Sequence, residues 1–153
     1  EIMQSGVFHY KTLGEAKTLT HILSQACPDP QSVLVGLSEL LINAVEHGNL
    51  GISYNKKTEM LTNNTWEDSI DSMLEDDAYK DKFVEVTFER LPHEIHFTII
   101  DQGDGFDWKP YMQLDPTRGG DNHGRGIAMA GLISFHSIEY RGKGNEVQAV
   151  LVL

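Results

Sequence analysis

Polar side chains on one side of a predicted helix near residue 40 could bind a metal ion and a phosphate group. Glu39 and Asn43 are four residues apart, so in a helix their side chains reach the same volume. Either Glu46 or His47 extends this polar column, opposite a broad apolar face. An amide oxygen is a hard ligand for Mg²⁺, and a nearby carboxylate could accept a proton beside a transferred phosphate. For Glu39 and Asn43 alone, a solvated surface glutamate and a capping asparagine are the commoner explanation.

A second group of residues follows the apolar segment 97–100, where Asp101 precedes Gly103 and Gly105. An aspartate could accept a hydrogen bond from the exocyclic amine of an adenine, and glycines let the backbone approach the ring closely. A tight turn at the end of a strand accounts for the same residues. Calcium binding is disfavoured, because the later bidentate glutamate of a calcium loop is missing.

Gly124, Arg125 and Gly126 open another predicted helix. Free N–H groups at a helix N-terminus can bind an anion, although a Gly-x-Gly pattern alone is weak support. The segment lacks the Gly-Lys-Ser/Thr of a P-loop, and no strand leads directly into it as a dinucleotide fingerprint requires. Arg118 and Arg125 are cations in an otherwise acidic protein, which favours a phosphate as their neighbour.

The elements that must position these residues are strands and helices in alternation. Alternating apolar and polar residues predict strands over 6–12, 83–88, 95–100, 135–141 and 146–153. Apolar residues at helical spacing predict helices over 14–26, 30–47 and 126–133, the second of them ended by Gly48–Asn49 in a left-handed cap. This order predicts an α/β (α+β) fold of two layers with a largely antiparallel sheet.

Two segments do not fit this simple alternation. Residues 50–81 are mostly polar and read as a long insertion. An acidic amphipathic helix is expected within it, because Trp66, Ile70, Met73 and Leu74 repeat at helical spacing. Residues 106–123 combine turn-forming residues with aromatic ones and predict a ligand-gated loop. Its Trp108 and Tyr111 are expected to pack down when the loop closes.

The composition limits the classes of function. A chain of 153 residues predicts one domain. A net charge of -11 with only 12 Lys and Arg disfavours nucleic acid as a partner, and no apolar run approaches the roughly 20 residues that cross a membrane. The single cysteine, Cys27, excludes an internal disulfide and predicts a reducing, cytoplasmic environment. Because the chain opens on Glu1, we expect it to be part of a longer protein.

Taken together, these motifs resemble those of the Bergerat-fold ATPases, which include DNA gyrase, the histidine kinases and the anti-sigma-factor serine kinases. The resemblance rests on Glu39-x-x-x-Asn43 with His47-Gly48-Asn49, then Asp101-x-Gly103-x-Gly105, then Gly124-x-Gly126. It covers nearly the whole chain. The form of the first motif and the short final hairpin look most like the anti-sigma-factor kinases.

This resemblance implies a histidine kinase-like ATPase domain over residues 1–153, with an insertion at 50–81. It implies a two-layer sandwich with a mixed, mainly antiparallel sheet and helices on one face, and it implies ATP and Mg²⁺ as cofactors. Glu39 would be the general base, Asn43 the Mg²⁺ ligand and Asp101 the adenine-reading carboxylate. The remaining nucleotide contacts would be His47, Gly103, Gly105, Arg118, Gly124, Arg125 and Gly126, with residues 107–123 as a lid.

The implied function is phosphorylation or sequestration of a protein partner, either an anti-sigma-factor antagonist or a sigma factor-like regulator. A homodimer is compatible with this function. The alternative is an ATP-binding interaction module without phosphotransfer. Glu39 favours the kinase because a pure binder needs no base, whereas the insertion favours the module. A histidine kinase is disfavoured because no histidine lies in a dimerising coiled coil, and a gyrase-type enzyme because a transducer domain and basic surface are missing.

Overall fold

A computed structural model of the chain describes residues 2–111 and 126–153. Its elements are β1 (Ser5–Tyr10), α1 (Leu13–Ser24), α2 (Pro30–Asn43), a π-helical turn (Ala44–Asn49), α3 (Tyr54–Thr62), α4 (Trp66–Glu75), β2 (Val84–Arg90), β3 (Glu94–Ile100), a 3-10 turn (Lys109–Tyr111), α5 (Gly126–Ile133), β4 (Ser137–Arg141) and β5 (Glu146–Val152). No helix in the described ranges is long and apolar enough to cross a membrane.

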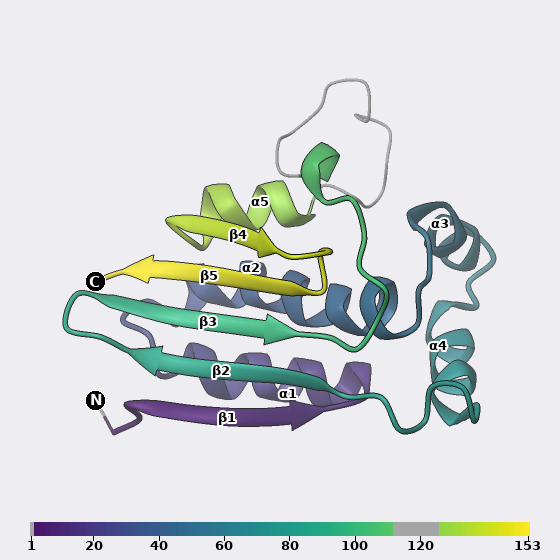
Figure 1. The fold of residues 1–153 in the computed structure, drawn as a ribbon, viewed down its shortest axis with the longest axis horizontal. Helices are drawn as coiled ribbons and strands as arrows, with labels where there is room; N and C mark the ends of the chain where they lie inside the picture. The colour runs from purple at the N-terminus through teal and green to yellow at the C-terminus, as the bar shows by residue number, and fades with distance from the viewer. Residues whose placement is uncertain (1, 112–125) are drawn as a thin grey trace.

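The strands form one open sheet in the order β1-β2-β3-β5-β4, and each pair of neighbours in it is antiparallel. The last strand in the chain, β5, lies between β3 and β4, so it pairs with the central strand as well as with β4, its partner in the final hairpin. Figure 1 shows α1, α2 and α5 together behind one face of this sheet. The predicted two-layer fold with a mainly antiparallel sheet and helices on one face is therefore confirmed.

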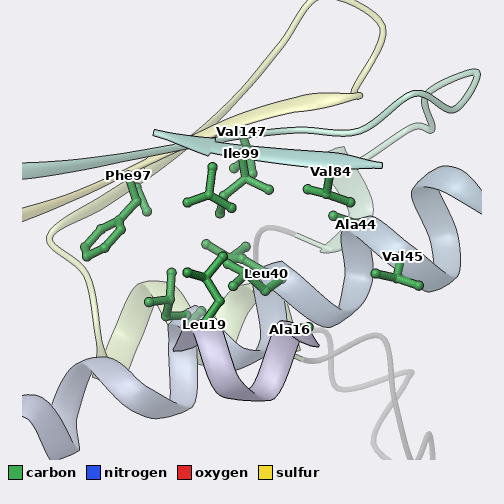
Figure 2. Packing of buried hydrophobic residues seen from close by; sticks show 14 of the residues in the cluster. Ala16, Leu19, Leu40, Ala44, Val45, Val84, Phe97, Ile99 and Val147 are labelled. Atoms are coloured by element: carbon green, nitrogen blue, oxygen red, sulfur yellow. The ribbon is translucent and has the colours of Figure 1, made fainter. Parts of the chain in front are cut away.

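The core lies between the sheet and these helices. Along β2, β3 and β5 every second residue is buried, which is why the alternation in the sequence predicted these strands correctly. Figure 2 shows Phe97, Ile99 and Val147 of the sheet facing Leu19 of α1 and Leu40 of α2. Each fully buried side chain of this size stabilises the fold by about 1.5–3 kcal/mol, so the core fixes where α2 runs beneath the sheet.

Helix α2 begins as its sequence predicts but ends differently. The Asp29 side chain accepts a hydrogen bond from the backbone N–H of Ser32, and Pro30 occupies the first turn. The predicted left-handed cap at Gly48–Asn49 is wrong. The helix continues through a π-helical turn, in which the N–H of Leu50 donates to the carbonyl of Val45 at 3.0 Å, and the left-handed residue is Gly51, with φ 63°.

The insertion contains two helices, at the end of the sheet beyond α2 (Figure 1). The predicted amphipathic helix is α4, whose Ile70 is fully buried. The sequence did not predict α3, because Met60 is the one buried residue in it and leaves no apolar stripe to recognise.

The predicted loop at 106–123 is described only as far as residue 111, and the rest of it lies outside the described residues. Within the described part, Trp108 stacks on Tyr140 of β4 with ring centroids 5.8 Å apart. The tryptophan that we expected to pack down on loop closure is therefore already packed against the sheet.

Candidate functional site

A cavity opens between the C-terminal end of α2 and the sheet. It encloses about 310 Å³ of empty space, including its open mouth. Its lining residues come from α2 and its π-helical turn, from β3, β4 and β5, and from two loops. They are Leu40, Asn43, Ala44, His47, Gly48, Ile99, Asp101, Phe106, Tyr140, Gly144, Asn145 and Val147. The cavity therefore brings the first two sequence motifs together.

Asp101 is the buried carboxylate of this cavity, with 9% of its surface exposed. Its Oδ1 accepts a hydrogen bond from the N–H of Gly103 at 2.8 Å. No donor among the described residues is bonded to Oδ2. One oxygen is thus used to hold the turn, and the other is available to a ligand in the cavity.

The turn that carries Asp101 is held from both sides by asparagine residues. Asn49, at the end of the π-helical turn, accepts a hydrogen bond from the N–H of Gln102 through its side-chain oxygen at 2.7 Å. Asn145, directly before β5, accepts a hydrogen bond from the N–H of Asp101 through its carbonyl at 2.9 Å. Its side-chain amide donates to the carbonyl of Asp101 at 3.2 Å. These bonds fix the carboxylate relative to both α2 and the sheet.

The glycines of the second motif allow the backbone segments to touch. A Cβ at Gly103 would overlap with the carbonyl of Gly48, and a Cβ at Gly48 would overlap with the Asp101 carboxylate. Gly105 has a φ of 84°, and a Cβ there would overlap with the carbonyl of Lys143. Gly103 and Gly105 therefore bring the Asp101 turn against α2 and the β4–β5 turn.

Burial raises the pKa of Asp101 from 3.8 to about 6. The hydrogen bond from Gly103 and the positive charges of Lys143 and Lys82 lower the pKa and offset part of the effect. The carboxylate is therefore mostly ionised at neutral pH, and its burial in the ionised form lowers the stability of the fold.

The first motif divides between the cavity and its surroundings. Asn43 and His47 line the cavity, whereas Glu39 is half-buried one turn earlier on α2 and is not among the lining residues. Glu46, which the helical spacing left as the alternative to His47, is fully buried instead and forms an ion pair with Lys57 of α3. The helical spacing allowed either Glu46 or His47 to extend the polar column. The structure places His47 in the cavity and Glu46 in the interior.

Residues 16–151 match the family described as the histidine kinase-like ATPase domain. The chain belongs to this family. The match extends from α1 to β5 and contains all the predicted site residues. No curated protein matches the chain. Domains of this family bind ATP, usually with Mg²⁺, so membership indicates an ATP-binding regulatory domain.

The cavity combines apolar walls with one buried carboxylate. Leu40, Ile99 and Val147 provide the walls, and Oδ2 of Asp101 has no hydrogen-bond donor in the part of the chain that the structure describes. The described residues contain no group of three or more His, Cys, Asp or Glu side chains that could hold a metal ion. Mg²⁺ held by Asn43 would therefore depend on phosphate oxygens and water for its other ligands, as this ion commonly does.

The third motif is described only in part. Gly126 is the first residue of α5, as predicted, whereas Arg118, Gly124 and Arg125 lie outside the described residues. Helix α5 packs closely against α2. The hydroxyl of Ser134, the residue directly after α5, accepts a hydrogen bond from the N–H of Gly36 in α2 at 2.8 Å. Helix α5, which Gly126 opens, is therefore packed on α2, the helix that carries Asn43.

Sequence reasoning missed several residues of the cavity. Phe106 and Tyr140 meet edge to face with centroids 5.3 Å apart, and both line the cavity with Asn145. Phe106 directly follows Gly105, so its position next to the second motif could have indicated it as a site residue. Nothing in the sequence marked Tyr140 or Asn145, because they reach the site only through the pairing of β5 with β3 and β4.

Proposed function

We propose that this domain binds ATP with Mg²⁺ and phosphorylates a serine or threonine of a protein partner, of the class of anti-sigma-factor antagonists. The observation that carries this proposal is the Asp101 carboxylate, buried and fixed at Oδ1 but with Oδ2 free of described donors, in the same cavity as Asn43. An adenine amine can donate to that oxygen, which orients the phosphates toward α2. The order of the three motifs and the family of the chain support the same assignment.

Each of the three polar side chains then has a distinct role. Asp101 accepts the hydrogen bond from the adenine amine. Asn43 would hold Mg²⁺, which would neutralise part of the negative charge of the phosphate groups. Glu39, one turn from Asn43 on α2, would accept the proton of the attacking hydroxyl as the bond between the γ-phosphorus and the bridging oxygen breaks and ADP leaves.

A second candidate function is favoured by the insertion. The exposed side of α4 carries Glu67, Asp68, Asp71 and Glu75. Helix α4 lies next to α3 at the end of the sheet (Figure 1). A domain that binds ATP without transferring phosphate could present this surface to a partner in one nucleotide state only.

The experiment that separates the two functions uses the domain, γ-labelled ATP and the antagonist-like proteins of the source organism, and it measures both transfer and complex formation. The kinase predicts labelled antagonist with the native domain. With Glu39→Ala it predicts a rate lower by about 10²–10⁴-fold at unchanged ATP affinity. A nucleotide-dependent complex without labelled product supports the interaction module. If the domain does not bind ATP, both functions are refuted.

A further inference from the structure

Glu46 is a buried carboxylate for which the proposed phosphotransfer has no use. It lies in the π-helical turn, three residues after Asn43 and directly before His47, and its side chain is 1% exposed. Its Oε2 is 2.9 Å from Nζ of Lys57 in α3, whose side chain is 15% exposed. A salt bridge so deeply buried joins the nucleotide-motif helix to the insertion.

Trp66, the first residue of α4, completes this cluster. Nζ of Lys57 lies 5.5 Å from the centroid of the Trp66 ring, as in a cation–π contact. Burial raises the pKa of Glu46, and the positive charge of Lys57 together with the Trp66 indole lowers it again. The carboxylate of Glu39 raises it slightly further, which places the base candidate and Glu46 within electrostatic reach of each other.

The backbone around Glu46 provides a second link between the nucleotide motif and the insertion. The carbonyl of Glu46 accepts a hydrogen bond from the N–H of Ile52 at 2.9 Å. Nδ1 of His47 lies 2.5 Å from the carbonyl oxygen of Ile52, and the His47 ring stacks on Tyr54, the first residue of α3, with centroids 4.0 Å apart. His47 therefore lines the cavity and also contacts the first residue of α3.

Separation of a buried ion pair is strongly unfavourable, because removal of one partner leaves an uncompensated charge in the interior. A shift of α3 alone would therefore separate Lys57 from Glu46 and leave that carboxylate uncompensated. The residues on either side of Glu46, namely Asn43, His47 and Gly48, line the nucleotide cavity. A ligand that fixes those residues also fixes the carboxylate between them.

We propose that Glu46, Lys57 and Trp66 form a buried latch that couples nucleotide binding to the docking of the α3–α4 segment, residues 54–75. Nucleotide stabilises the docked segment, and by linkage the docked segment strengthens nucleotide binding by the same factor. The inference rests on the nucleotide site of the proposed function but requires no phosphotransfer. It gives the insertion a role as the element that reports nucleotide occupancy to a partner.

The chain supplies a matched pair of variants for the test. Lys57→Met removes the latch, whereas Lys56→Met removes the neighbouring lysine, which is exposed and pairs with Glu59 at 3.5 Å on the same helix. We expect Lys57→Met to weaken ATP and ADP binding by about 5- to 150-fold in calorimetry, the usual range of such couplings. Lys56→Met should bind as the native domain does. Hydrogen exchange of the α3 amides should slow on addition of ADP in the native domain and in Lys56→Met, but not in Lys57→Met.

A double variant guards against simple loss of the fold, because Lys57→Met alone leaves Glu46 buried without its partner. Glu46→Gln with Lys57→Met leaves no buried charge, so it should melt at about the native temperature while its α3 exchange no longer responds to ADP. The latch is refuted if ADP slows hydrogen exchange of the α3 amides in the double variant as much as in the native domain. It is also refuted if bound ADP leaves this exchange unchanged in the native domain. Failure of the native domain to bind any adenine nucleotide would instead refute the nucleotide site itself.

Discussion

Replacement of Asp101 by Asn should make the domain more stable and a poorer binder of ATP at the same time. The carboxylate is buried, and its pKa is raised from 3.8 to about 6 because burial disfavours the charged form. The folded domain therefore holds the Asp101 proton more tightly than the unfolded chain does. The contribution of Asp101 to the stability of the domain is therefore most favourable below pH 3.8, is lost as the pH rises through about 6, and stays absent above that value.

The size of the effect follows from the two pKa values. The difference between 3.8 and about 6 corresponds to about 3 kcal/mol of stability lost at pH 7. An asparagine does not titrate, and its side-chain oxygen can still accept the hydrogen bond from Gly103. Asp101→Asn should therefore raise the free energy of unfolding at pH 7 by up to about 3 kcal/mol, or the melting temperature by up to about 6–12 °C. The gain should disappear near pH 4.

The loss of binding has a different origin. An asparagine cannot accept as strongly from an adenine amine, and a hydrogen bond to a charged group is worth about 1.5–3 kcal/mol. ATP should bind roughly 10- to 150-fold more weakly in calorimetry. Thermal melts from pH 4 to 8, with Asp104→Asn in the same loop as an exposed control, would complete the measurement. A stability difference that does not change with pH, or an unchanged ATP affinity, would show that this account of Asp101 is wrong.

Three further outcomes are expected. Asn43→Ala should lower both ATP affinity and transfer by at least about 10-fold, unlike Glu39→Ala, and identical behaviour of the two variants would contradict their separate roles. Gly105→Ala should cost more unfolding free energy in urea than Gly142→Ala. Both residues have positive φ, worth about 1–2 kcal/mol each, but only a Cβ at Gly105 meets neighbouring backbone. ATP should bind at least about 10-fold more tightly than GTP in calorimetry, because Asp101 faces an acceptor oxygen in guanine; equal affinities would argue against an adenine site.

The sequence predicted the sheet and the start of helix α2 well, because both depend on local spacing. Alternation between core and solvent marks β2 and β3, and their hairpin needs no distant partner. The four-residue spacing of Glu39 and Asn43 survives in α2 because that part of the helix is regular. Asp101 was predicted from its place at the end of an apolar strand, and the structure puts it in the cavity.

The remaining features depend on contacts that local patterns do not encode. A π-helical turn holds more residues than an α-helical one, so spacing alone could not decide between Glu46 and His47. Helix α3 is held by the Glu46–Lys57 pair and by Met60 rather than by an apolar stripe. Asn145 reaches Asp101 across 44 positions of the chain, through the register of β5 against β3.

The place of β5 in the sheet also has a consequence for biosynthesis. During translation β3 leaves the ribosome well before β5. One edge of β3 therefore stays unpaired during this interval, and contacts between distant parts of the chain form slowly. In that interval Asp101 lacks the bonds from Asn145, and the cavity lacks Tyr140 and Val147. With the cavity as the proposed ATP site, ATP would stabilise the finished domain but not the nascent chain. A chaperone that shields the edge of β3 would act in the period when the ligand cannot.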